Sequence, residues 1–460
     1  MKNSTPRGFD LHFSINTTRT TNGYYRATLN LVSELDNNTL SNLQILIKAE
    51  EMTFQGRHAV ASVRFMKPRE DNSNMGGSMM AGVRFTILVF LSTTPVITGH
   101  ELWRVCYYTS WGSQRRDGSA LLPEDIDANL CTHINFAFTT LDSSGTEILT
   151  EQSYDINLLQ RLSALKTRNP ALKTLISLGG WETGSMKFHQ TVESRENMNK
   201  FAQNAIAFLR RHNLDGLDLD WEFPAARGSP ETDKQAYGEL LMVLHNAFAA
   251  EGQSSHKNRL LLTAAVAPSH LRTEQSYDVS LISRYCDFIN MMMYDFHGSW
   301  DNKTGPHSAL YSDDTYNINH TARYWELLGA QKDKLVIGVP LYGNVFTLLD
   351  PNDNDLGSAS FGGGDMPYYL ICQALQDGRA QEIVLNNERV PYMVLGKNWV
   401  TYDNVNSIRE KVDFVKQRGY GGVMVWSLDQ DDTHGVCGHK FPLLNSVADG
   451  IKQSGSSVIG

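Results

Sequence analysis

Cysteine is scarce in this chain of 460 residues, which has five, and no two of them form a C-x-x-C pair. Without such a pair, a structural zinc site or a thiol redox motif is not expected. Basic residues are also in deficit, because 41 Lys and Arg stand against 50 Asp and Glu, for a formal net charge of −9. This balance argues against nucleic acid or an anionic membrane as a partner, but it fits neutral and cationic ligands equally well.

The most informative segment near the front is 80–99, MAGVRFTILVFLSTTPVITG, which is too short and interrupted for a membrane-spanning helix. An arginine, an apolar run and then small residues have the layout of a secretory signal peptide. A buried strand of an upstream domain and an uncleaved anchor are the alternatives. The strand-like run RVCYYTSW at 104–111 favours the signal peptide, so we expect a secreted, extracellular protein without stable membrane insertion.

Residues 1–79 carry no catalytic pattern, and we treat them as an unassigned N-terminal extension. If 80–99 is a signal peptide, this extension lies before the true start of the protein or belongs to an alternative product.

The rest of the chain is organised around 214–224, LDGLDLDWEFP. Asp218, Asp220 and Glu222 alternate with apolar side chains, and a period of two places the acids on one face of a strand. Neighbouring carboxylates would then lie about 6–7 Å apart along the strand. An edge strand whose acids face water is one interpretation. The apolar opposite face and the strong helix before it favour a buried strand with functional acids.

Eight apolar runs alternate with amphipathic helical patterns from residue 104 onward. Near-continuous apolar runs suit parallel strands covered on both faces, so the order predicts an α/β fold, a (β/α)8 TIM barrel, with a doubly wound sheet as the alternative. In such a barrel the chemistry lies at the carboxyl ends of the strands, where Glu222 would stand. The expected strands are 104–110, 133–141, 173–179, 216–222, 260–267, 287–294, 335–341 and 421–428.

The alternation of strands and helices is interrupted after the seventh strand. There the segment 344–400 is first Gly-rich and polar and then contains short apolar segments. A structureless loop of that length is not expected in a compact domain. We therefore expect a small α+β insertion domain at 344–400 that walls one side of the cleft. The catalytic barrel would comprise 100–343 and 401–452.

Five motifs follow one another along the chain: SLGGW at 177–181, DGLDLDWEFP at 215–224, MMYDFHG at 292–298, LYGNVFTL at 341–348 and MVWSLDQDD at 424–432. In this order they resemble glycoside hydrolase family 18, specifically the secreted animal-type chitinases, and the resemblance extends from residue 104 to residue 447. The motif DGLDLDWEFP carries the family's D-x-x-D-x-D-x-E pattern in full.

The resemblance implies a retaining, substrate-assisted hydrolysis in which the substrate's own 2-acetamido oxygen is the nucleophile. Glu222 would be the acid, its pKa raised by the like charges of the two nearby aspartates. Asp220 would hold the acetamide N–H, and Asp218 would share a proton with Asp220. Tyr294 would donate a hydrogen bond to the acetamide carbonyl, and Asp295 would contact the sugar beside the cut. Asp215 is out of phase with the acids and is expected to be structural.

Aromatic side chains would supply the platform for the sugars, because pyranose faces are apolar and pack on flat rings. Trp426 would be the floor of the subsite where the sugar is distorted, and Trp300 and Trp399 are further candidates. The expected substrate-binding residues are Tyr107, Trp111, Phe138, Trp181, Met292 and Trp426.

An odd number of cysteines in a secreted chain predicts two disulfides and one free thiol. The resemblance implies the pairs Cys106 with Cys131 and Cys372 with Cys437, which leaves Cys286 as a buried thiol. We expect no cofactor, no metal ion and a monomer, and the resemblance implies chitin or chito-oligosaccharides as the partner.

One position departs from the family pattern, since Asn344 stands where an arginine usually follows Tyr-Gly, which puts rate and subsite affinity in doubt. No Cys-rich chitin-binding module or Ser/Thr-rich linker follows in this sequence, so we expect either weak binding to crystalline chitin or a sequence that is truncated before such a module. A chitinase-like lectin that binds without cutting is the alternative from another class, but such relatives typically lose the acid that Glu222 retains. An endo-β-N-acetylglucosaminidase acting on N-glycans shares the acid motif, but the insertion and aromatic cleft favour linear chitin.

Overall fold

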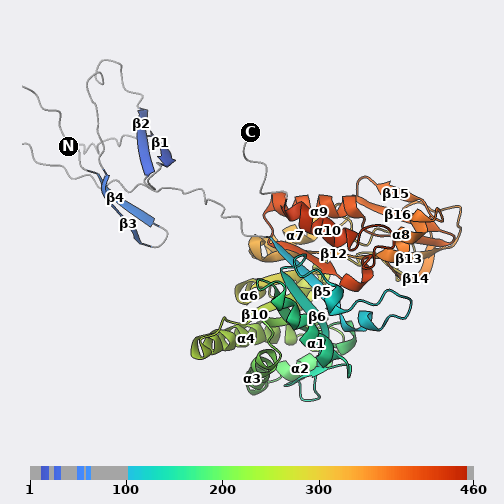
Figure 1. Ribbon diagram of the computed structural model, residues 1–460, viewed down its shortest axis with the longest axis horizontal. Coiled ribbons are helices and arrows are strands. Elements are labelled where there is room, and N and C mark those ends of the chain that lie inside the picture. Colours follow the sequence, from blue (N-terminus) through green and yellow to red (C-terminus); the bar gives the residue numbers. More distant parts are fainter. Residues whose placement is uncertain (1–11, 20–24, 33–48, 56–57, 64–101, 453–460) are drawn as a thin grey trace, which may run out of the picture. The chain divides into compact units, whose positions relative to one another are not determined.

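The computed structural model describes residues 12–19, 25–32, 49–55, 58–63 and 102–452 (Figure 1). Its contacts divide the chain into two units, Met1–Thr98 and Gly99–Gly460. The expected signal peptide at 80–99 lies outside the described residues and stays a prediction. The first unit contains two antiparallel hairpins, which pair β1 (His12–Arg19) with β2 (Tyr25–Val32) and β3 (Ala49–Gln55) with β4 (His58–Val63).

Eight parallel strands form a closed barrel in the second unit. Each strand pairs with its neighbours in chain order, and the pairing of β5 with β6 closes the ring. The predicted (β/α)8 barrel is therefore confirmed, and the open doubly wound sheet is wrong. The barrel strands are β5 (Trp103–Thr109), β6 (His133–Leu141), β8 (Lys173–Gly179), β9 (Gly216–Asp220), β10 (Leu261–Val266), β11 (Phe288–Met291), β12 (Leu335–Pro340) and β18 (Gly422–Trp426), and β7 (Ile148–Thr150) adds an antiparallel pair to β6.

Helices surround the strands, and the core lies between the two layers (Figure 1). Leu217 and Leu219 of β9 are fully buried in this core, as their alternation with the acids predicts. None of the described helices is long and apolar enough to cross a membrane. The helices are α1 (Asp155–Ala164), α2 (Ser185–Val192), α3 (Arg195–Arg211), α4 (Asp233–Ser255), α5 (His270–Ser276), α6 (Val279–Tyr285), α7 (Ile318–Leu327), α8 (Tyr368–Gln376), α9 (Val405–Arg418) and α10 (Pro442–Lys452).

Local signals in the sequence fix where several helices begin and end. Ser194 caps α3 by accepting a hydrogen bond from the backbone N–H of Asn197, and basic residues occupy its last turn. Asn404 caps α9 in the same way, and Gly419 ends it in the left-handed conformation that glycine adopts readily. These two helices flank the strands that carry the central acids and Trp426.

The acid-bearing strand is shorter than predicted, because β9 ends at Asp220 and its pairing with β8 ends there too. Trp221 and Glu222 belong to the loop that follows, so the prediction of a strand through residue 222 is wrong. The alternation of faces nevertheless continues past the strand. Trp221 is 1% exposed and stacks on Phe188 in the core, with ring centroids 5.1 Å apart, while Glu222 turns toward the cleft.

Between β12 and α9 the chain forms a second, antiparallel sheet with one helix, α8, in place of a long loop. The strand order is β14-β13-β17-β16-β15, and this sheet projects on one side of the barrel (Figure 1). Its presence after the seventh barrel strand agrees with the predicted α+β insertion, whose domain limits at 344–400 stay a prediction. The strands are β13 (Tyr342–Leu348), β14 (Ser360–Pro367), β15 (Glu382–Leu385), β16 (Val390–Leu395) and β17 (Asn398–Thr401).

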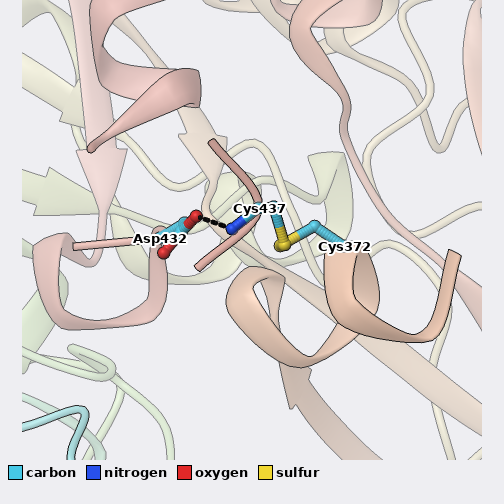
Figure 2. Close-up of side chains that lie close together, drawn as sticks. All are labelled: Cys372, Asp432 and Cys437. Carbon is cyan, nitrogen blue, oxygen red and sulfur yellow. Dashed lines mark hydrogen bonds between the residues drawn. A yellow bond between two sulfur atoms is a disulfide. The ribbon is translucent and has the colours of Figure 1, made fainter. Parts of the chain in front are cut away.

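Two disulfides join the pairs Cys106–Cys131 and Cys372–Cys437, and Cys286 is a buried free thiol. The second disulfide ties α8 of the insertion to the loop after β18. Figure 2 shows Asp432 beside it, where this carboxylate accepts a hydrogen bond of 2.7 Å from the backbone N–H of Cys437. Both sulfur atoms are used in the disulfide, so this cluster of two cysteines and an aspartate fastens the loop and offers no thiolate to a metal ion.

Candidate active site

A cavity of about 460 Å³ opens at the carboxyl ends of the barrel strands. All the predicted catalytic and substrate-binding residues line it except Asp218, which is buried below its floor. The strands come from distant parts of the sequence, and barrel closure brings their ends together. The lining is completed by Glu151, Gly179, Glu182 and Ala265.

A second cavity of about 440 Å³ continues the cleft on the side of the insertion sheet. It shares Trp111, Asp295 and Trp426 with the first, so the cleft passes on both sides of the central tryptophan. Trp300 lines this second cavity and is 64% exposed. Trp399 is instead fully buried in the insertion sheet, and its prediction as a cleft residue is wrong.

Asp218 is a buried carboxylate that accepts four hydrogen bonds, two on each oxygen. Burial is the largest effect and raises the pKa of Asp218 above its ordinary value, although the four donors act in the opposite direction. An ionised carboxylate offers about four acceptor sites, and the protein fills all of them. The donors are Thr263 Oγ1 at 2.6 Å and Asn290 Nδ2 at 3.1 Å to Oδ1, and Tyr107 OH at 2.6 Å and Ser177 Oγ at 2.8 Å to Oδ2.

Asp220 has the opposite environment, although it points to the same side of β9. It is 3% exposed, and its Oδ1 atom has no hydrogen-bond partner among the described residues. Burial raises its pKa well above the ordinary value, and the charges of Glu222 and Asp218 raise it further. Gly179 permits this close packing, because a Cβ atom there would lie 2.1 Å from the backbone oxygen of Asp220. A buried, unpartnered carboxyl oxygen on a cavity wall is available to a donor on a bound ligand.

Glu222 lies at the same wall with a pKa raised to about 7. Burial is the largest cause of this shift, the positive charge of Arg227 opposes it, and the negative charge of Asp295 adds to it. The sequence prediction attributed the shift to the aspartates of β9, and burial is the larger effect. Arg227 also donates hydrogen bonds to the backbone oxygens of Trp181 at 2.7 Å and of Glu222 at 3.1 Å.

Asp295 follows β11 and is held in place by its neighbours. Its backbone has φ of 56°, which is uncommon for a residue other than glycine. Its Oδ1 atom accepts hydrogen bonds from Tyr342 OH at 2.6 Å and Asn344 Nδ2 at 3.0 Å, and His307 Nδ1 lies 3.5 Å away. Burial acts to raise the pKa of Asp295, but these partners hold it below the ordinary value. The departure at Asn344 thus still supplies a donor to Asp295.

Tyr294 is buried beside these acids, with its hydroxyl 3.9 Å from the sulfur of Met424. Burial and the charges of the surrounding carboxylates raise its pKa well above the ordinary value. The phenol therefore stays protonated and can donate a hydrogen bond to an oxygen in the cavity.

Aromatic rings form the cleft floor around Trp426. Phe138 stacks on it with ring centroids 5.5 Å apart and planes at 24°, and Tyr107 meets it edge-on at 5.4 Å. Trp111 stands 6.3 Å away and is 44% exposed. Trp181 lies farther along the cavity, 56% exposed, with the Arg227 guanidinium 3.7 Å from its ring centre. These surfaces can stack against the flat faces of sugar rings.

Residues 104–431 match the family described as "Glycosyl hydrolases family 18". The chain belongs to this family. Chitotriosidase-1 of Mus musculus is 39% identical over 362 residues, which cover 75% of this chain and 76% of that protein.

Solved structures of family 18 proteins superpose on this one closely. Ostrinia furnacalis group IV chitinase, solved in complex with allosamidin, gives a TM-score of 0.73 at 34% identity, with 77% of this chain and 100% of that one covered. Human YKL-39, described as a pseudo-chitinase with retained chitooligosaccharide-binding properties, gives a TM-score of 0.72 at 35% identity, with 76% and 100% covered. Similarity to family 18 therefore does not separate cutting from binding.

Several residues of this family 18 site were missed or misjudged from the sequence. Ser177 of the SLGGW motif was given no part in the site, and it donates a hydrogen bond to Asp218. Thr263 and Asn290 also bond to this carboxylate, and each is a polar residue inside an otherwise apolar strand. That interruption was the available signal, because a polar side chain on the inner face of a barrel strand requires a partner. No sequence signal pointed to Arg227, because its hydrogen-bond partners depend on the conformation of the loop after β9.

Proposed function

We propose that this protein is a chitinase that hydrolyses β-1,4-linked N-acetylglucosamine polymers with retention of configuration and with Glu222 as acid and base. The carrying observation is the contrast between neighbouring acids. Asp218 has four donors, Asp220 has an oxygen without a partner, and Glu222 has a pKa raised to about 7. Carboxyl groups of different protonation at one cleft wall support acid–base chemistry.

In the first step Glu222 gives its proton to the glycosidic oxygen, which departs with the leaving sugar. The carbonyl oxygen of the substrate's acetamide attacks the anomeric carbon from the opposite face and forms an oxazolinium ion. Asp220 accepts a hydrogen bond from the acetamide N–H with its free oxygen. The oxazolinium ring carries a positive charge, and the nearby carboxylates would stabilise this charge.

In the second step the ionised Glu222 removes a proton from water, and the water oxygen bonds to the anomeric carbon. The bond between this carbon and the acetamide oxygen breaks, so the acetamide is regenerated. Two inversions leave the product as the β anomer. Asp218 would stay in place throughout, because its four donors are fixed by the barrel.

Two further residues would orient the sugar at the cut. Tyr294 would donate its hydroxyl hydrogen to the acetamide carbonyl oxygen. Asp295 has its Oδ1 atom occupied by protein donors, which leaves Oδ2 for a sugar hydroxyl. The rings around Trp426 would hold the sugar face, and the second cavity would take the sugars on the other side of the cut.

Binding without hydrolysis is the competing candidate, and Asn344 is the observation that favours it. Asn344 supplies a neutral amide where the family pattern has an arginine. The positive charge of that arginine is therefore missing near Asp295. The geometry supports the enzyme more strongly, because Glu222, Asp220 and Tyr294 all line one cavity. We further propose that the protein is secreted and acts as a monomer.

Glu222→Gln tests the assignment of the acid, since glutamine keeps the shape of the side chain and removes the proton. We expect turnover of a chito-oligosaccharide to fall by about 10²–10⁴-fold, while the dissociation constant stays within a few-fold. Glu147→Gln is the matched control, because Glu147 is an exposed acid outside both cavities. Turnover that survives in Glu222→Gln would overturn the assignment.

A further inference from the structure

The loop after β11 forms a short antiparallel pair with the residues that lead into β14. Lys303 bridges Ala359, and the backbone oxygen of Asn302 accepts a hydrogen bond of 3.0 Å from the backbone N–H of Ser360. Among the described residues, no backbone hydrogen bond joins this loop to β14 beyond Ser360. The loop therefore covers the start of β14, and this cover ends at Asn302.

Past that point the edge of β14 is open. In the described sheet this strand is outermost and pairs with β13 alone. Residues 361–365 are exposed, and the Phe361 side chain is 58% exposed. An edge with free backbone groups and an exposed aromatic ring can pair with a second chain, and proteins usually protect such edges. The open segment FGGGD has a single charge, on Asp365, so charge gives it little protection.

The residue where the cover ends is also an acceptor for N-glycosylation. Asn302, Lys303 and Thr304 form an N-x-T sequon, whose middle residue is not proline. The Asn302 side chain is exposed, and its amide has no hydrogen bond in the part of the chain that the structure describes. The folded protein therefore leaves room for a large group on the Asn302 Nδ2 atom.

The hydroxyl of the same sequon is engaged in the fold. Thr304 is 2% exposed, and its Oγ1 atom donates to the backbone oxygen of Asp355 at 2.8 Å and accepts from the N–H of Gly357 at 2.9 Å. A sugar must therefore be attached before this loop folds onto the insertion. The two disulfides indicate that the chain folds in an oxidising compartment, as secreted proteins do.

A second sequon in the barrel unit has different surroundings. Asn319 is half-buried in the first turn of α7, and its Oδ1 atom accepts a hydrogen bond of 3.2 Å from Arg418 of α9. An oligosaccharide on this amide would disturb the contact between the two helices. Asn302 has no such contact to lose, so it is the better acceptor.

We propose that Asn302 carries an N-linked oligosaccharide, which covers the open edge of β14 beside Phe361. The donor is a lipid-linked oligosaccharide pyrophosphate. A bond forms between the Asn302 Nδ2 atom and the anomeric carbon of the first sugar, the bond from that carbon to the pyrophosphate oxygen breaks, and the amide loses one proton. The modification rests on the proposed secretion and is independent of hydrolysis at Glu222.

Mass analysis of the secreted protein tests the modification without requiring turnover. The full chain is expressed in a secreting animal cell, and the peptide that contains Asn302 is measured before and after peptide N-glycosidase, which leaves aspartate at the modified position. We expect Asn302→Gln to lose the mass of one oligosaccharide. Asn386→Gln is the matched control, because Asn386 is exposed on the insertion but lies outside any sequon, so its mass should keep the oligosaccharide.

Secreted wild-type protein with an unmodified Asn302, or with an oligosaccharide on Asn319 alone, would overturn the proposal. Unmodified protein retained in the cytosol would overturn the proposed secretion as well. A glycosylated protein that fails to hydrolyse chito-oligosaccharides would refute the chitinase and support the modification.

Sedimentation velocity tests whether the oligosaccharide covers β14. Asn302→Gln should self-associate at concentrations where the secreted wild type and Asn386→Gln stay monomeric. Adding Phe361→Ser to Asn302→Gln should reduce this association, because it removes the exposed ring from the open edge. Equal sedimentation of the glycosylated wild type and Asn302→Gln would overturn the covering of the edge.

Discussion

The three acids of the DLDWE stretch differ because their surroundings differ. Asp218 is saturated by donors from four other strands, whereas Asp220 has an oxygen with no partner. Glu222 lies past the strand end, where burial raises its pKa to about 7. A repeat of similar side chains thus gives one carboxyl group saturated by protein donors, one with an unpartnered oxygen and one with a pKa raised to about 7.

The raised pKa of Glu222 has a direct kinetic consequence. The acid works only while protonated, so kcat/KM should be steady below the pKa and fall as pH rises through about 7. Arg227→Gln removes a charge that lowers this pKa, and the fall should then move to higher pH. Rates on a chito-oligosaccharide across pH measure both effects. A fall near the ordinary pKa of glutamate, or a shift to lower pH in Arg227→Gln, would contradict this assignment.

Much of the site was predictable from residue spacing and motifs, and the remainder depends on contacts between distant segments. The acids, Tyr294, Asp295 and the aromatic residues were named from the sequence, and all but Asp218, Trp300 and Trp399 line one cavity. The donors to Asp218 could not be assigned, because their register depends on how β5, β8, β10 and β11 pair around the barrel. Trp399 is fully buried and was wrongly expected in the cleft. The sequence pattern around a tryptophan in a strand is the same whether the indole faces a core or a cleft.

The barrel strands were predictable because each is an apolar run buried on both faces. The runs 133–141 and 173–179 coincide with β6 and β8, while β9 ends two residues earlier than expected. The loop between β12 and α9 was expected to fold, but its strand order was not predictable. The antiparallel partners β13 and β17 are separated in the sequence by β14, α8, β15 and β16. Their pairing is therefore evident only in the folded structure.

The disulfide Cys372–Cys437 should matter for the stability of the insertion, because it closes a segment with a sequence separation of 65 residues. Replacing both cysteines by serine should lower the free energy of unfolding by about 2–4 kcal/mol, since the unfolded chain regains entropy. Denaturant unfolding followed by tryptophan fluorescence measures the loss. Coincident unfolding midpoints for the variant and the oxidised wild type would show that the disulfide carries no stability.

The molecule as a whole consists of two units, and only the second contains the barrel and the cleft. If 80–99 is a signal peptide, the secreted protein should consist of this second unit. Expression in a secreting eukaryotic cell followed by N-terminal sequencing should give a start near His100. A secreted protein that begins at Met1 would contradict the signal peptide.

Retention of the β anomer tests the joint use of Glu222 and the substrate's acetamide most directly. Proton NMR during the first minutes of hydrolysis of an N-acetylglucosamine hexamer reports the anomer before mutarotation mixes the two forms. The wild-type protein should release β-anomeric product first, with the α form appearing later. Release of the α anomer first, or tight binding with no hydrolysis at all, would contradict a retaining, substrate-assisted chitinase.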